Sequence, residues 1–322
     1  MNYIKMSPIA GMSGYGGGAT ALPFSGAALD AWYGDRGLFY GGDDNTGHGD
    51  KEQIDYISIS TTGNASDFGD MTQGSEWYGE GTFSNTVRGV TGEGSSGALQ
   101  YITFASAGNS TDFGDNDGTW FGGAASSGKS IDRGIQGGGR YSGNEMNTIQ
   151  YITISTTGNT TDFGDLTYTG KYLSGCNDST RCLFQGGHVG SQNTINYVES
   201  ATTSDATDFG DSDFNHKLGG ATSDHTRGVI IGGTSTGAIE NMCYVTIQSP
   251  GNATDFGDLI DSRTYTTAAC TNGTRCQVGG GFISNASIVG IQYFTIQTTG
   301  NATDGGDLAK AKYWSQSSSG DA

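Results

Sequence analysis

The residues of this chain that could do chemistry recur at fixed places in a repeated phrase. The acidic ones belong to copies of D-F-G-D, whose first aspartates are Asp67, Asp112, Asp162, Asp208 and Asp255. A hard cation such as calcium binds carboxylate and main-chain oxygens. Each copy offers only two carboxylates, and the copies fall in different repeats, so we expect these aspartates to bond the backbone of a tight turn. Calcium is the alternative, and no other cofactor is expected.

Arginines form a second series with almost the same spacing, at Arg36, Arg88, Arg133, Arg181, Arg227 and Arg275. Such a ring could bind a sugar or an acid. Recurrence at one structural position favours a different interpretation, in which each planar guanidinium pairs with a carboxylate of its own or the next repeat. We expect the D-F-G-D aspartates to be these partners, which makes both series structural.

The five cysteines contain two pairs with equal spacing, Cys176 with Cys182 and Cys270 with Cys276. Each pair flanks the turn between two expected strands, so each could form a cross-strand disulfide. Two small buried thiols are the alternative, and the sequence leaves both open. Cys243 has no evident partner, and the distance between the pairs argues against a zinc site.

No catalytic constellation is present in the sequence. The four histidines lack metal-ligand spacing, and no serine elbow, P-loop or HExxH motif occurs. We therefore expect a protein that is not an enzyme. A net charge of −18 argues against a nucleic-acid surface. No apolar run is long enough for a membrane helix, and the first residues do not resemble a signal peptide.

The phrase YITISTTGNTTDFGD at residues 151–165 returns, with changes, about every 45 to 50 residues. Each unit has four short extended stretches. In residues 149–154 both alternating faces are partly apolar, which is typical of a strand whose sheet lies between two other sheets. With 57 glycines and few helix-favouring stretches, the chain is predicted to be all-β, a single β-propeller domain over residues 1–322.

Six complete repeats span about residues 26–307. Residues 1–6 match the third strand of a repeat, and residues 312–322 resemble a first strand. We therefore expect seven blades, the last one closed by both chain ends, with residues 1–25 and 308–322 contributing its strands. Closure would remove the free sheet edges that invite aggregation. The second strand of that blade is missing from the sequence, so a neighbouring molecule is an alternative source.

The order Arg-Gly, Gly-Gly and Tyr in each unit resembles kelch repeats, although the tryptophan that kelch repeats carry after this tyrosine is absent. The wording YITI-x-TTGNATDFGDL is more similar to the repeat of kelch-like virion structural proteins of marine tailed phages, particularly those infecting cyanobacteria. The similarity covers nearly the whole chain. It implies a structural protein of a tail, fibre or capsid that is assembled in the host cytoplasm, contacts other virion proteins, and could form homo-oligomers.

One face of the expected propeller carries loops that differ between repeats, whereas the TTGNATD turns make the other face regular. Because binding residues concentrate on loops held by a rigid scaffold, we expect the loop face to bind a host glycan or protein. The candidate residues are Tyr141, Asn144, His188, Gln192 and Phe282, and the alternative is that they are ordinary solvated loop residues. Aromatic residues near the first strands, such as Trp314, could stack on sugars or pack between blades. The alternative function is a free or cell-surface lectin or adhesin, which would be extracellular.

Overall fold

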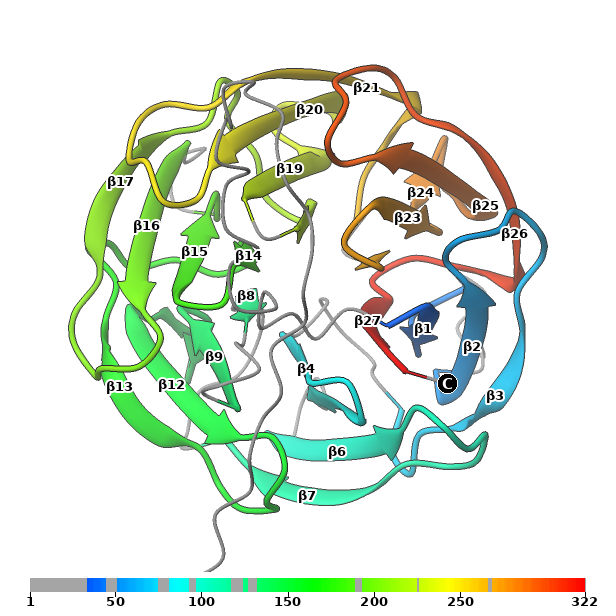
Figure 1. The fold of residues 1–322 in the computed structure, drawn as a ribbon, viewed down its shortest axis with the longest axis horizontal. Helices are drawn as coiled ribbons and strands as arrows, with labels where there is room; N and C mark the ends of the chain where they lie inside the picture. Colours follow the sequence, from blue (N-terminus) through cyan, green and yellow to red (C-terminus); the bar gives the residue numbers. More distant parts are fainter. Residues whose placement is uncertain are drawn as a thin grey trace, which may run out of the picture.

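The computed structural model describes residues 34–44, 51–74, 81–92, 97–116, 124–126, 132–188, 193–224, 226–265 and 268–321. These residues contain strands, turns and loops and no helix. Six antiparallel sheets surround a central axis, and each has four strands that follow one another from the axis to the rim (Figure 1). The protein is an all-β, six-bladed β-propeller.

The blades, each given from its innermost to its outermost strand, have the following bounds. The first blade contains β27 (Gln316–Gly320), β1 (Arg36–Tyr40), β2 (Gln53–Ser58) and β3 (Ser66–Asp70), and the second contains β4 (Thr82–Ser84), β5 (Arg88–Gly92), β6 (Ala98–Thr103) and β7 (Thr111–Asp115). The third contains β8 (Ala124–Ser126), β9 (Arg133–Gly137), β12 (Thr148–Thr153) and β13 (Thr161–Asp165), and the fourth contains β14 (Ser174–Asn177), β15 (Arg181–Gln185), β16 (Thr194–Glu199) and β17 (Thr207–Asp211). The fifth contains β18 (Gly220–Ser223), β19 (Arg227–Thr234), β20 (Ala238–Thr246) and β21 (Thr254–Arg263), and the sixth contains β22 (Ala269–Thr271), β23 (Arg275–Gly279), β25 (Ala286–Thr295) and β26 (Thr303–Lys312).

The repeated I-x-Y-I-T-I phrase forms the third strand of each blade, and its two faces enter two different cores. Ile149 and Tyr151 of β12 pack against the fourth blade, whereas Ile152 and Ile154, which follows the strand, pack against the second. The prediction of a strand between two other sheets is confirmed. Six such apolar clusters are present, one at each boundary between neighbouring blades. The core is therefore divided into six radial layers, and no blade buries its apolar faces alone.

The TTGN turn of each blade binds the outermost strand of the preceding blade, an arrangement that we call the inter-blade clasp. At the second blade, the Gly108 and Ser110 N–H groups donate to the Phe68 and Asp70 carbonyls over 2.8 and 2.9 Å. In return, the Asn109 Oδ1 accepts from the Asp70 N–H over 3.1 Å. The clasp covers the free edge of the outer strand, which would otherwise be open to pairing with another chain.

The glycine of D-F-G-D makes the clasp possible, because the two backbones approach closely there. A Cβ on Gly69 would lie 2.5 Å from the Gly108 carbonyl carbon, and the residue has a φ of 147°. The same close approach joins Gly306 of the last blade to Gly63 of the first, with 2.6 Å to the carbonyl carbon. Clasps thus run through the boundary between the last and first blades, and the ring is closed.

The expected seventh blade is not present among the described residues. Strand β27 pairs instead with β1, from Arg36 opposite Gly320 to Tyr40 opposite Gln316, and becomes the innermost strand of the first repeat's sheet. Figure 1 shows β27 beside β1. Because six cores and six clasps already close the ring, no gap is left for another sheet. Residues 1–25, which were expected to contribute strands, lie outside the described residues.

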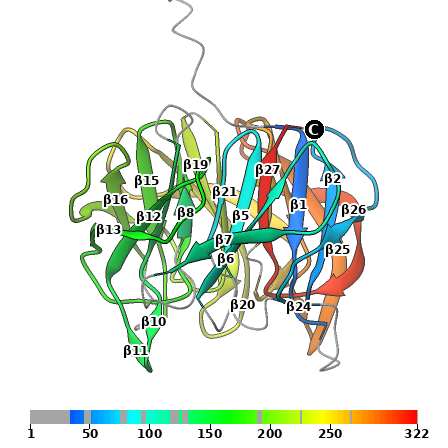
Figure 2. The same cartoon turned by 90° about the horizontal axis from the view of Figure 1, so that it is seen from below.

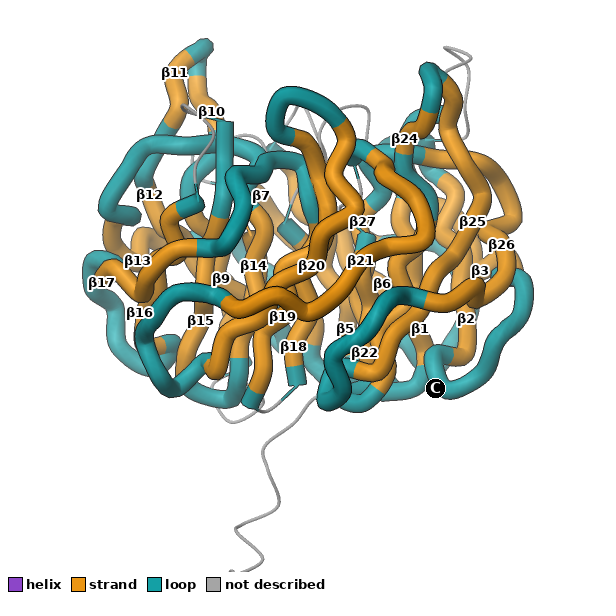
Figure 3. Tube along the Cα trace, turned by 90° about the horizontal axis from the view of Figure 1, so that it is seen from above, coloured by secondary structure: helices purple, strands orange, loops and turns teal. Residues whose placement is uncertain are grey.

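The described loops that differ between repeats project from one face of the disc, which we call the loop face. In the third blade, β10 (Arg140–Tyr141) and β11 (Asn144–Glu145) form a hairpin whose turn residues have positive φ angles, 48° at Ser142 and 90° at Gly143. In the sixth blade, β24 (Phe282–Ile283) pairs with the start of β25. Figures 2 and 3 show both hairpins extending from the same side of the propeller.

Candidate functional site

The recurring arginines hold neighbouring blades together, but the D-F-G-D aspartates are not the partners that were expected, although Arg181 does pair with a carboxylate of its own blade, Glu199, over 2.8 Å. Each guanidinium lies over the tyrosine ring of its own blade, for example Arg88 over Tyr101 at 4.2 Å. Its Nη1 then donates to a main-chain carbonyl of the next blade, in this case that of Ile154 over 3.1 Å. Equivalent bonds start from Arg36, Arg133, Arg181 and Arg227. Arg275 also lies over its blade's tyrosine, and Gln277 Nε2 donates to the corresponding Ile59 carbonyl over 3.0 Å.

The first aspartates of the D-F-G-D copies lie exposed on the outer strands, while the phenylalanine between the acids is buried. The second aspartate of each copy takes part in the clasp through its backbone. Within the described part of the chain, no group of three or more histidine, cysteine, aspartate or glutamate side chains is arranged to hold a metal ion. The second aspartates therefore help to join the blades through their backbone groups, as Asp70 does, whereas the first aspartates, such as Asp67 and Asp112, belong to the outermost strands.

The two cysteine pairs do not form disulfides, which corrects one of the two possibilities left open by the sequence. Cys176 lies opposite Leu183, and Cys182 lies opposite Asn177. This offset of one residue sends the two thiols to opposite faces of the sheet, Cys176 into the core between the fourth and fifth blades and Cys182 into the core between the third and fourth. Cys270 and Cys276 are separated in the same way. All five cysteines are buried free thiols.

Steric fit explains why two of these thiols stand where they do. A Cβ on Gly228 would lie 2.5 Å from the Cys176 Sγ, and one on Gly37 would lie 2.5 Å from the Cys270 Sγ. Each thiol therefore occupies the space that a glycine of the next blade leaves open. Burial in these apolar layers raises the pKa of Cys176 and Cys276 to about 12.

The predicted binding residues fall into separate groups on the loop face. Tyr141 and Asn144 are opposite each other at the exposed end of the third-blade hairpin. His188 belongs to the fourth blade and contacts the same hairpin at Glu145, where its Nδ1–H donates to Glu145 Oε1 over 2.8 Å. Gln192 lies outside the described residues. Phe282 is in the sixth blade, in an aromatic group that the prediction did not foresee.

This aromatic cluster consists of Tyr265, Phe282, Tyr313 and Trp314, and it forms where the sixth blade meets the segment leading to β27. The ring centroids of Tyr313 lie 4.8 Å from Phe282 and 4.6 Å from Trp314. Tyr265 contacts the other three rings. Tyr313 is buried, and the other three side chains are partly exposed. The cluster gives the loop face a rigid aromatic surface beside the closing strand.

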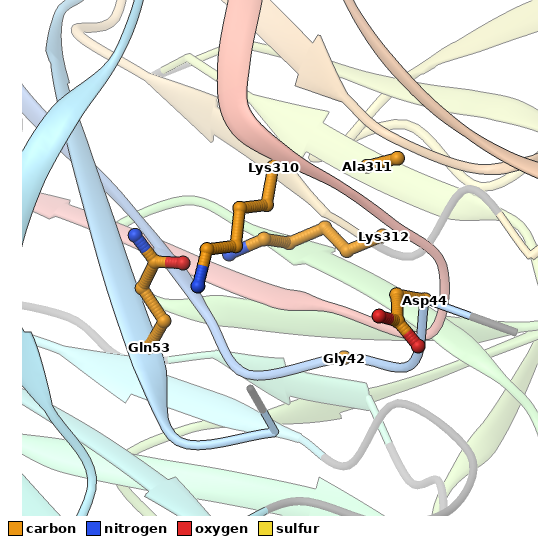
Figure 4. A pocket seen from close by; sticks show the side chains of 6 residues that line it. All are labelled: Gly42, Asp44, Gln53, Lys310, Ala311 and Lys312. Carbon is orange, nitrogen blue, oxygen red and sulfur yellow. The ribbon is translucent and has the colours of Figure 1, made fainter. Parts of the chain in front are cut away.

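A small polar pocket, which we call the seam pocket, adjoins this cluster at the boundary between the last and first blades. Gly42, Asp44, Gln53, Lys310, Ala311 and Lys312 line it (Figure 4). Its volume of about 20 Å³ is the room that one water-sized group needs. Asp43 and Tyr313 exchange two main-chain hydrogen bonds of 2.9 and 3.0 Å, so the pocket and the cluster are held to each other.

Lys312, which lines the pocket, forms an ion pair with Asp55, with the Lys312 Nζ 3.0 Å from the Asp55 Oδ2. Both side chains are almost fully buried, Asp55 at 0% exposure. Burial raises the pKa of Asp55 and lowers that of Lys312, because each charge has lost its hydration. The pair therefore carries a desolvation penalty that its mutual attraction must offset.

Sequence reasoning missed Asp55, although the repeat alignment contains the signal. Its position in the third strand is held by Gln100, Gln150, Asn196, Cys243 and Gln292 in the other blades. Several of these side chains accept hydrogen bonds from the segment that follows the preceding blade, such as Gln100 from the Thr72 N–H over 2.9 Å. Asp55 replaces a neutral side chain at this position with a charge, and Lys312 supplies the compensating cation.

Comparisons with known proteins returned neither a matching family model nor a matching curated protein. Among the described residues, no helix is both long and apolar enough to span a lipid bilayer.

Proposed function

We propose that this chain is a structural module of a bacteriophage virion, a propeller of the tail, fibre or capsid that holds other particle proteins and contacts the host surface. The wording of its repeat supports this proposal, through its resemblance to kelch-like virion proteins. We propose a location in the particle, after assembly in the host cytoplasm, and a role that involves no catalysis.

The observation that carries the proposal is that the repeated residues make structural contacts, whereas the exposed aromatic residues lie in loops that differ between blades. The repeated arginines, tyrosines, glycines and turn asparagines serve contacts within and between blades. The exposed tyrosine and the partly exposed aromatic cluster belong to loops that differ from blade to blade. A closed disc with variable loops on one face is suited to presenting a binding surface.

Mass spectrometry of purified virions tests the proposal directly. We expect the chain at a fixed copy number relative to the major capsid protein, and retained after density-gradient purification. Absence from intact particles, with the chain found only in the lysate, would overturn it. Copies released together with tail or fibre proteins after mild disruption would identify its neighbours in the particle.

A lectin or adhesin that acts outside a particle is the second candidate. The aromatic cluster beside the seam pocket favours it, since aromatic rings next to polar groups are common in ligand-binding sites. A purified soluble chain that binds glycans but never enters virions would support this candidate over the first.

A further inference from the structure

We infer that the seam pocket and the aromatic cluster together bind a saccharide, which inserts one hydroxyl group into the pocket and rests its ring on the aromatic side chains. The biological role of this site in host attachment rests on the proposed function. The binding itself can be tested on the isolated chain.

The polar groups of the seam pocket select for a hydroxyl. The Gln53 Oε1 is buried and has no hydrogen-bond partner among the described residues, so it requires a donor. The Asp44 carboxylate also accepts hydrogen bonds, whereas the Lys310 ammonium only donates them. Figure 4 shows the Lys310 ammonium directed toward the Gln53 amide. A hydroxyl group donates and accepts at once, so it fits this mixture better than a carboxylate or an ammonium.

The size of the pocket limits what enters it. A volume of about 20 Å³ admits one oxygen and excludes a whole sugar ring. The remainder of a ligand must therefore lie outside, over the neighbouring surface. That surface is the aromatic cluster, joined to the pocket through the Asp43–Tyr313 hydrogen bonds and through Ser287, whose hydroxyl donates to the Asp44 carbonyl over 3.0 Å.

The cluster suits the apolar face of a sugar ring. Phe282 is fixed by two main-chain bonds to Thr264, of 2.9 and 3.1 Å, which also place Tyr265 against it. Large rings that are already held in position lose little conformational entropy on binding. The strong negative charge of the whole chain, −18, disfavours an acidic ligand at long range and favours a neutral sugar.

The test uses the full chain on an array of neutral and acidic glycans, followed by titration of the best ligand by NMR. We expect a neutral glycan to bind. Replacing Phe282→Ala or Lys310→Met should weaken its affinity by about tenfold or more, since each removes a contact at the centre of the site. Lys310 is exposed, so its substitution leaves folding intact even if Phe282→Ala does not.

Val87→Ala is the control, because Val87 is an exposed apolar residue, 60% exposed, in the turn between β4 and β5 and outside the proposed site. This variant should bind like the unmodified chain. The inference is overturned if no glycan binds, if Lys310→Met and Phe282→Ala both bind normally, or if Val87→Ala loses binding to the same extent as the two site variants. Capture of a particle protein at the same residues in place of a glycan would also overturn it. None of these results depends on whether the chain is found in virions, so failure here is separate from failure of the proposed function.

Discussion

Asn64 Oδ1 accepts a hydrogen bond of 3.2 Å from the main-chain N–H of Asp307, and this bond joins the first blade to the last. The same bond recurs at each of the other five boundaries, with Asn109, Asn159, Asp205, Asn252 and Asn301 as the acceptors. In the fourth blade an aspartate serves as well as an asparagine. All six turns therefore use a side-chain oxygen as the acceptor, and the amide nitrogen of asparagine is not needed for this bond.

Replacing Asn64 by alanine should lower the free energy of unfolding by about 1 kcal/mol, because a main-chain N–H loses its acceptor. Asn64→Asp should be nearly neutral, since Asp205 shows that a carboxylate fits the position. Urea denaturation of the three proteins measures both effects. Equal losses for the alanine and aspartate variants would show that the acceptor oxygen is not what the turn supplies.

The third strand and the turn after it could be predicted from the sequence because their residues recur, whereas the bonds of the clasp to the preceding blade were not predicted. Alternation in residues 149–154 identified both packing faces, and the repeated Asn and Asp marked the turn. The partners of the arginines could not be predicted. Every residue has a main-chain carbonyl, so the sequence does not indicate which carbonyl, such as that of Ile154, accepts from an arginine. Aspartates at the same spacing as the arginines were therefore the partners that the sequence indicated.

Blade number was the larger error, and its cause lies in the innermost strands. These strands share small residues but no common wording, as Gln316–Gly320 and Ala124–Ser126 illustrate. A first strand can then be assigned to several places in the chain. The disulfide possibility depended on register, in which a shift of one residue moves a side chain to the other face. Spacing alone does not fix that register.

All five thiols should be unreactive toward a thiol reagent in the native protein at pH 8 and reactive after unfolding. The cysteines are buried free thiols, and desolvation raises the pKa of Cys176 to about 12, so little thiolate forms. A chromogenic disulfide reagent releases one coloured thiolate for each protein thiol that reacts, so its absorbance counts the reactive thiols. The count is made for the native protein and for the protein unfolded in guanidinium. Fewer than five reactive thiols in the unfolded, unreduced chain would reveal a disulfide and contradict the register described above.

Lys312→Met should be strongly destabilising, by roughly 3 to 5 kcal/mol, because it leaves the Asp55 charge buried without its partner. The double variant Asp55→Gln/Lys312→Met should recover much of this loss, since glutamine occupies the position of Asp55 in other blades, as at Gln100. Thermal and urea unfolding of both variants test the coupling. If the double variant is no more stable than Lys312→Met, the ion pair is not the source of the loss.

His216 should make the fold sensitive to mild acid. Its side chain is 1% exposed, and burial lowers its pKa from 6.5 to about 4 because the charged imidazolium is poorly solvated there. Protons are then bound more tightly by the unfolded chain than by the native one. The stabilisation that neutral His216 contributes is fully present above about pH 6.5 and decreases as the pH falls. Below about pH 4 it no longer changes, and the total loss of stability is about 3 kcal/mol.

The variant His216→Gln isolates this contribution, because glutamine does not titrate. Urea midpoints of both proteins should be measured from pH 7.5 down to pH 5, where few carboxylates titrate. The unmodified chain should lose stability over this range faster than the variant does, whatever the offset between them at pH 7.5. If the two stability curves are parallel, the folded protein accommodates protonated His216 and the prediction is wrong. Water would then reach the imidazole, or the segment around His216 would shift, although the Gly187 N–H donates to the His216 carbonyl over 3.0 Å.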